Sequence, residues 1–147
     1  MKIPLQRLQL CRESTLVYNP QGTILNAEES ANLFSRHFGD YASEVMLILL
    51  LNSKQRPIGL IPAHIGTLDQ TMCKVRDIFV PALLAGAKSI ILGHNHPSGD
   101  VTFSESDVES TFALIHAGEI LGVKVLDHIC FSINEGNFSS MKQKGYM

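Results

Sequence analysis

One stretch, residues 94–107, constrains the fold of this chain more than any other. Two histidines, His94 and His96, follow an apolar run at residues 89–93 that predicts a short buried strand. Side chains of a strand alternate between its two faces, so a strand that continues to His96 would direct both imidazoles to one side. Pro97 cannot donate a hydrogen bond to a neighbouring strand, so the strand should end before it.

A turn and the start of a helix follow the histidines. Residues 97–100 read Pro-Ser-Gly-Asp, a typical turn sequence, and Ser104 begins a helical pattern with Asp107 in its first turn. Two imidazoles and the Asp107 carboxylate would supply three ligands for a divalent metal and leave a fourth position open to water. Ser104 and Asp107 also fit a helix N-cap with an acidic residue at its third position. Both interpretations can hold, because the serine can cap the helix while the aspartate binds metal.

The same stretch carries a family resemblance. It matches His-x-His-Pro-x6-Ser-x2-Asp, the metal motif of the JAMM (MPN/JAB) metallohydrolases, and the wording His-Asn-His-Pro-Ser-Gly resembles the RadC branch. Gly66-Thr67, Arg76 and Leu126-Asp127-His128 occur in the order and at the approximate spacing of that branch, so the resemblance covers residues 40–140. It implies an α/β fold, with a JAB/MPN-like mixed sheet flanked by helices on both faces.

The resemblance also implies roles for particular residues. It identifies His94, His96 and Asp107 as ligands of Zn²⁺, which would lower the pKa of its water to roughly 7 for attack on an amide carbonyl. Glu44 takes the place of the family's general base, and Ser104 that of the serine that stabilises the oxyanion. Helix capping alone remains the alternative for Ser104. Asp127 and His128 could orient a metal ligand or fill buried hydrogen-bonded positions.

Length, composition and charge limit the classes of protein to which this chain can belong. A length of 147 residues predicts one domain over residues 1–147, and 45% hydrophobic with 18% charged residues is typical of a soluble globular protein. The net charge of −2 and the lack of a Lys/Arg run argue against nucleic acid as a partner. No apolar run is long enough to span a membrane, and the first residues do not resemble a signal peptide. Three isolated cysteines fit a cytoplasmic location.

Hydrophobic periodicity predicts the remaining elements. We expect helices over 27–38, within 68–86 and over 104–118, strands over 45–51, 58–61 and 123–133, one or two strands in 4–18, and a helical turn near 138–143. Pro81 should kink the second helix or restrict it to its later part. Val108, Phe112 and Ile115 should share one side of the third helix. Along the last long strand, Val125, Asp127, Ile129 and Phe131 should share one face, and Leu126, His128 and Cys130 the other.

The metal motif and the resemblance to the JAMM family together imply a zinc-dependent hydrolase of amide, peptide or isopeptide bonds. Glu44 lies far from His94 in sequence and can reach the metal only if strand 45–51 and the strand before His94 are antiparallel neighbours, which requires a mixed sheet. The alternatives are a non-catalytic MPN-type binding module, a non-haem iron site built from the same ligands, and a protein associated with DNA repair. The sequence does not identify the peptide or protein substrate. It is also compatible with a homo-oligomer.

Overall fold

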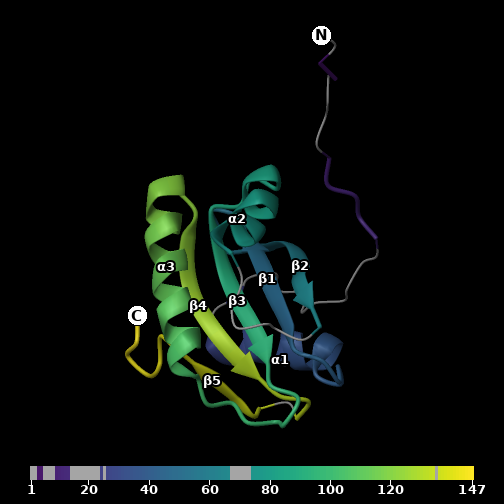
Figure 1. The fold of residues 1–147 in the computed structure, drawn as a ribbon, viewed down its shortest axis with the longest axis vertical. Helices are drawn as coiled ribbons and strands as arrows, with labels where there is room; N and C mark the ends of the chain where they lie inside the picture. The colour runs from purple at the N-terminus through teal and green to yellow at the C-terminus, as the bar shows by residue number, and fades with distance from the viewer. Residues whose placement is uncertain (1–2, 5–8, 14–23, 25, 67–73, 135) are drawn as a thin grey trace.

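The computed structural model describes residues 3–4, 9–13, 24, 26–66, 74–134 and 136–147. A five-stranded sheet with the order β2-β1-β3-β4-β5 forms its centre. The strands are β1 Val45–Leu51, β2 Pro57–Ile65, β3 Ser89–Asn95, β4 Lys124–Phe131 and β5 Phe138–Ser140, and the helices are α1 Ala27–Phe38, α2 Val75–Leu84 and α3 Glu105–Leu121. In Figure 1, α2 and α3 cover one face of the sheet and α1 covers the other. The predicted α/β fold, with helices on both faces, is confirmed.

Strand β1 lies inside the sheet, as its continuous apolar sequence predicts. All seven of its residues are buried. Met46, Ile48 and Leu50 pack into the hydrophobic cluster that includes residues of α2 and α3. The alternate residues, among them Leu47 and Leu49, pack into the cluster that includes α1. The sheet therefore separates two cores, one on each face, and β1 contributes to both.

The sheet is mixed, and this arrangement determines which chain segments meet at its edge. Strand β1 is antiparallel to both β2 and β3, β3 is parallel to β4, and β4 is antiparallel to β5. Met46 lies opposite His94 in the β1–β3 register. The start of β1 and the end of β3 are consequently neighbours, as the sequence argument for Glu44 required.

Helix α1 has the predicted bounds because its end signals are local. The Asn26 side chain accepts a hydrogen bond from the Glu29 amide at 2.9 Å, which is the expected N-cap contact. Gly39 is the C-cap residue. Ala31 and Phe34 are buried on the face toward the sheet, and Phe38 packs at its margin.

Helix α3 is longer than predicted, and its most buried residues are not those of the predicted stripe. It continues to Leu121 and ends at Gly122, whose φ of 72° is a left-handed conformation. Asp107, Thr111, Leu114 and Gly118 are its buried residues, whereas Phe112 is 51% exposed. A Cβ at Gly118 would overlap the Val123 carbonyl oxygen, so the glycine lets α3 lie close to the chain entering β4. Val108, Phe112 and Ile115 share one side of α3, as predicted, but this side is only partly buried, because Ile115 packs against the core while Phe112 is exposed.

The face assignment along β4 was wrong at its first part. Val125 packs on the side of α2 and α3, whereas Ile129 and Phe131 pack on the side of α1. Ile90 pairs with Val125 and the next residue of β3 pairs with Asp127, so the β4 register shifts by one residue there. Such a bulge reverses the alternation of side chains. Beyond it, His128 and Cys130 alternate with Ile129 and Phe131 as predicted.

Smaller differences concern the other segments. Strand β2 is longer than predicted, and α2 contains residues on both sides of Pro81, so the proline does not restrict the helix to its later part. The tail forms β5 and a turn at residues 141–145, where we expected a helical turn. The strands expected within 4–18 lie mostly outside the described residues, as does the first part of the stretch 68–86. Within the described part of the chain, no helix combines the length and apolar character needed to cross a bilayer.

Candidate metal centre

Three side chains meet where β3 ends and α3 begins. The His94 Nε2 and His96 Nε2 atoms are 3.2 Å apart. The Asp107 Oδ2 atom lies 3.6 Å from His94 Nε2 and 3.8 Å from His96 Nε2. The His94 and Asp107 side chains are 1% and 2% exposed, whereas His96 is 22% exposed. The site is thus buried on the His94 side and reaches solvent beside His96.

His96 lies just beyond β3 and is oriented by the following turn. Its Nδ1 atom contacts the Asp100 carbonyl oxygen at 2.9 Å. A carbonyl only accepts hydrogen bonds, so Nδ1 carries a proton, and in the neutral ring Nε2 then presents its lone pair toward His94 and Asp107. Asp100 shapes this turn, as expected, because its Oδ1 accepts from the Thr102 amide at 2.9 Å. Hydrogen bonds from the side chain and backbone of Thr102 lower the pKa of the Asp100 carboxyl.

Asp107 is also part of a capping box. Its Oδ2 accepts a hydrogen bond from the Ser104 amide at 2.7 Å, and its own amide donates to Ser104 Oγ at 3.1 Å. The oxygen that caps α3 is therefore the one that faces the histidines. A carboxylate oxygen has a second lone pair, so the cap leaves Oδ2 with capacity for a further partner.

His94 and His128 form a buried pair behind the site. The His94 Nδ1 and His128 Nε2 atoms are 2.8 Å apart. Burial lowers the pKa of His94 to about 4, against an opposing effect of Asp107, and burial also holds the pKa of His128 well below its usual value. Both rings are therefore neutral near pH 7, which is the form in which imidazole binds metals. On its other side, His128 Nδ1 lies 2.6 Å from Thr111 Oγ1.

Cys130 is a group that the sequence argument missed. It lies opposite His94 in the β3–β4 register, and His94, His96 and Cys130 form a cluster whose ligand atoms lie within 4.8 Å of one another. Its Sγ atom is 3.7 Å from His96 Nδ1, the ring nitrogen already bonded to Asp100. Burial, followed by the carboxylates of Asp107, Asp100 and Glu44, raises the pKa of Cys130 to about 12. Only the strand pairing reveals Cys130, because no sequence spacing links it to the histidines.

Asp107 and Cys130 differ in which histidine nitrogens they lie close to. Asp107 Oδ2 is within 3.8 Å of the Nε2 atom of both histidines. The closest contact of Cys130 is with the opposite nitrogen of His96, which faces away from that convergence. The His94–His96–Cys130 cluster remains a set of possible ligands, but the three atoms that face one another belong to His94, His96 and Asp107.

Glu44 lies at the same edge of the sheet. It directly precedes β1. Because side chains alternate between the faces of a strand, Glu44 lies on the same face as Met46, which pairs with His94. The Asn95 side chain orders this segment, because its Oδ1 accepts from the Val45 amide at 2.7 Å and its Nδ2 donates to the Ser43 carbonyl at 3.3 Å. Glu44 is half-buried, and its charge contributes to the raised pKa of Cys130. The fold thus brings Glu44 to the neighbourhood of the histidines.

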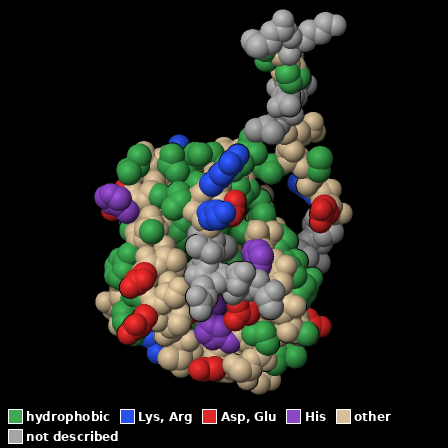
Figure 2. All heavy atoms as spheres, viewed as in Figure 1, with side chains coloured by type: hydrophobic (Ala, Val, Ile, Leu, Met, Phe, Trp, Pro, Cys, Tyr) green, Lys and Arg blue, Asp and Glu red, His purple; other side chains and the backbone are tan. Residues whose placement is uncertain are grey.

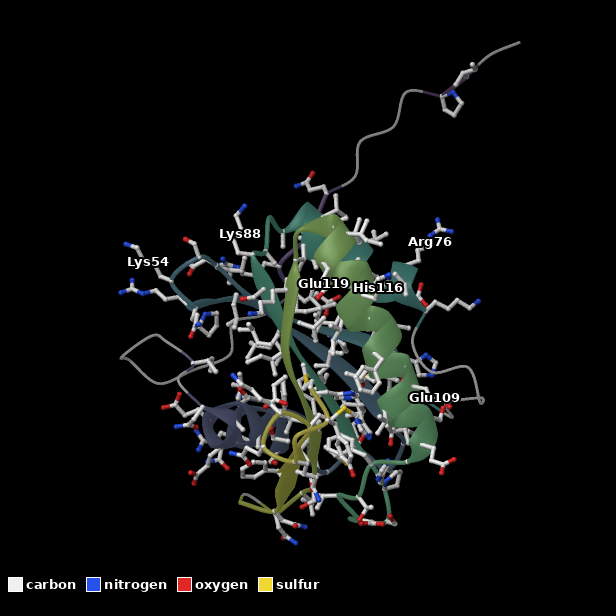
Figure 3. All side chains as sticks on the ribbon, turned by 90° about the vertical axis from the view of Figure 1, so that its left-hand side faces the viewer. Lys54, Arg76, Lys88, Glu109, His116 and Glu119 are labelled. Carbon is white, nitrogen blue, oxygen red and sulfur yellow. The ribbon has the colours of Figure 1, made fainter. Side chains whose placement is uncertain are left out.

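Two further polar residues, Asp127 and His116, have contacts outside the site. Asp127 accepts hydrogen bonds from Ser140 Oγ at 2.6 Å and from the Lys142 amide at 3.1 Å, so it joins β4 to the C-terminal segment. His116 is exposed on α3 and lies 3.8 Å from Glu119. Figure 3 shows this pair on the part of α3 away from Glu109.

In Figure 2, charged and histidine side chains are dispersed over the visible face of the molecule among hydrophobic ones.

Comparison with known proteins gives a family for this fold and site. The family model described as a RadC-like JAB domain matches residues 24–146. A UPF0758 protein of Caldanaerobacter subterraneus is 40% identical over 134 residues, which are 89% of this chain and 57% of that protein. A UPF0758 protein of Staphylococcus haemolyticus is 37% identical over 129 residues, 88% of this chain and 56% of that protein. The chain spans a little over half the length of these relatives. It belongs to the RadC-like JAB domain family.

Proposed function

We propose that this chain is a zinc-dependent hydrolase of amide, peptide or isopeptide bonds, with His94, His96 and Asp107 as the metal ligands. The observation that carries the proposal is the convergence of His94 Nε2, His96 Nε2 and Asp107 Oδ2, which lie 3.2, 3.6 and 3.8 Å from one another. Membership of the RadC-like JAB domain family supports it. The curated relatives carry no activity in their names, so the activity is our inference.

The spacing of the three atoms fits a tetrahedral ion. Ligand bonds of about 2.0–2.2 Å at tetrahedral angles put the ligand atoms about 3.3–3.6 Å apart. The distances in the site agree with this range within a few tenths of an ångström. Two neutral imidazoles and one carboxylate are also a donor set that zinc accepts in hydrolytic enzymes, with the fourth position left to water. Zinc bound there would lower the pKa of that water and polarise a substrate carbonyl.

The accessible side of the site indicates where substrate would approach. His94 and Asp107 are almost fully buried, whereas His96 is partly exposed. A scissile carbonyl would therefore reach the site past His96. Glu44, on the neighbouring strand end, would take a proton from the attacking water and pass it to the leaving amine. This role is supported by the antiparallel pairing of β1 with β3 and by the contacts of Asn95 with the segment before β1.

Ser104 would stabilise the negative charge that develops on the carbonyl oxygen. Its Oγ accepts a hydrogen bond from the Asp107 amide. This contact uses an oxygen lone pair and leaves the hydroxyl proton free to donate. A donor placed at a developing oxyanion is among the strongest contributions that a single side chain makes to catalysis.

Metal analysis combined with a cleavage screen tests the proposal. We expect about one zinc per chain, loss of the zinc from Asp107→Asn, and zinc-dependent cleavage of peptides or isopeptide-linked substrates. The His116→Asn variant is the matched control, because His116 is an exposed histidine of the same helix as Asp107 and contacts Glu119. A chain that binds another metal in preference to zinc, or that holds zinc and cleaves no amide substrate, would contradict the proposal.

A further inference from the structure

Three buried side chains form a line of hydrogen bonds behind the candidate metal site. His94 Nδ1 contacts His128 Nε2 at 2.8 Å, His128 Nδ1 contacts Thr111 Oγ1 at 2.6 Å, and Thr111 Oγ1 contacts the Asp107 carbonyl oxygen at 2.7 Å. The side chains come from β3, β4 and α3, and all are buried. The line starts at one proposed ligand and ends at the main chain of another.

The Asp107 carbonyl oxygen at the end of this line fixes the donor and the acceptor of every hydrogen bond in it. The Asp107 carbonyl can only accept, so the Thr111 hydroxyl donates its single proton there. Toward His128 the hydroxyl must then accept, which places a proton on His128 Nδ1. A neutral imidazole carries one N–H, so His128 Nε2 is an acceptor and His94 Nδ1 is the donor. The remaining nitrogen, His94 Nε2, is left without a proton.

We infer that His128 and Thr111 are positioning residues that fix the tautomer of His94, so that its Nε2 lone pair faces His96 and Asp107. The inference rests on the proposed function for its purpose, which is metal binding. The tautomer itself is a property of the metal-free chain. His96 reaches the same state by a simpler route, because its Nδ1 donates directly to the Asp100 carbonyl. His94 is fully buried, and His128, supported by Thr111, accepts the hydrogen bond from His94 Nδ1 that the Asp100 carbonyl accepts from His96 Nδ1.

Thr111 affects His94 although two hydrogen bonds separate them. Without its hydroxyl, the proton on His128 Nδ1 has no acceptor in the line. His128 can then carry its proton on Nε2 and donate it to His94 Nδ1. His94 would in turn hold its own proton on Nε2, where it blocks a metal. Replacing the Thr111 hydroxyl by a methyl group is therefore expected to reverse the donor and acceptor roles in the hydrogen bond between His94 and His128.

The first test measures the tautomers by ring ¹⁵N NMR of the metal-free protein. We expect both His94 and His128 to carry their protons on Nδ1 in the wild type and in Thr111→Ser, which keeps the hydroxyl. Thr111→Val has nearly the same shape without the hydroxyl, and we expect it to move the His94 proton to Nε2 in a substantial fraction of molecules. A merely structural role for Thr111 would change stability and leave the ring nitrogens as they are.

The second test measures zinc affinity by competition with a chelator. Loss of a hydrogen-bond partner behind a metal ligand typically lowers affinity by about 10- to 100-fold. We expect a loss of this size in Thr111→Val and near wild-type affinity in Thr111→Ser. Ser110→Ala is the matched control, because Ser110 Oγ also donates to the Asp107 carbonyl, at 3.1 Å, but lies outside the line. Its affinity should stay within a factor of about three, since the line is intact.

A second pair of variants covers the case in which Thr111→Val fails to fold. His128→Gln places a carbonyl oxygen near the position of Nε2 and can still accept from His94, whereas His128→Leu cannot. We expect the glutamine variant to bind zinc at least ten times more tightly than the leucine variant. Equal affinities for this pair, or an unchanged His94 tautomer in folded Thr111→Val, would overturn the inference. A wild type that carries the expected tautomers but binds no zinc would instead contradict the proposed function.

Discussion

Asp107 shows how one residue can serve both the helix and the site. Its Oδ2 accepts from the Ser104 amide and also faces both histidines. The two tasks are compatible because the helix start fixes the direction of the carboxylate before any metal is present. The cap also places a negative charge at the N-terminus of α3, where the helix dipole favours it. The sequence was compatible with both capping and metal binding; the capping box is present, and metal binding is our proposal.

Ser104 permits a test that separates capping from catalysis. Replacement of an N-cap serine by alanine typically costs about 1 kcal/mol, and replacement by glycine only a few tenths. If the hydroxyl stabilises an oxyanion, both Ser104→Ala and Ser104→Gly should lower turnover by about 100- to 1000-fold. Zinc affinity should change much less than turnover. Urea unfolding, chelator competition and the cleavage rate measure the three quantities.

The glycine variant decides between the two roles of Ser104. It removes the hydroxyl while the helix cap loses little, so its stability should stay close to that of the wild type. Wild-type turnover in Ser104→Gly, together with a stability loss confined to Ser104→Ala, would leave capping as the role of this residue.

At the scale of elements, local signals were sufficient where local chemistry determines the structure. The bounds of α1 and β1 follow from an N-cap and from an apolar run, and both were predicted correctly. The faces of the first part of β4 and the end of α3 were not, because they depend on how the elements pack in the fold. A bulge opposite Ile90 reverses the side of Val125, and Gly118 lies close to the Val123 carbonyl and the Phe79 ring instead of ending α3. Of the site, the motif indicated His94, His96 and Asp107, but Cys130 and Thr111 emerge only from strand pairing and helix packing.

Glu44 is the residue whose proposed role depends most on the arrangement of elements. The antiparallel pairing of β1 with β3 brings it to the edge where His94 lies. A general base typically contributes about 100- to 10,000-fold to the rate. We therefore expect Glu44→Gln to lower amide hydrolysis by this factor while about one zinc per chain remains bound. Steady-state cleavage rates and metal content of the same preparation test this.

The matched control for Glu44 lies on the other side of the sheet. Glu28 is an exposed carboxylate on α1, which covers the face opposite α2 and α3. Glu28→Gln should therefore hydrolyse substrate at the wild-type rate. Full activity in Glu44→Gln, or loss of its zinc, would rule out the assignment of Glu44 as a base that is not a ligand.

At the scale of the whole molecule, the site joins segments that are remote in sequence. His94 is in β3, His96 follows that strand, Asp107 begins α3, and His128 supports His94 from β4. These groups come together only in the folded chain, so the unfolded chain offers no comparable site. Any ion that binds the folded form preferentially must stabilise it. The proposed metal site and the stability of the fold are thus linked.

Thermal unfolding of metal-free protein, with and without zinc, tests this linkage. Free zinc at 100 times its dissociation constant adds about 2.7 kcal/mol to the unfolding free energy. At about 2–4 °C per kcal/mol for a chain of this size, the midpoint should rise by roughly 5–11 °C. His96→Asn should lose the shift, because it removes a proposed ligand from the partly exposed side of the site. His116→Asn should keep it, because that histidine lies on the outer surface of α3, where Glu119 is its partner. Equal shifts in the two variants would mean that zinc stabilises the chain through some other group, and the ligand set proposed here would then be wrong.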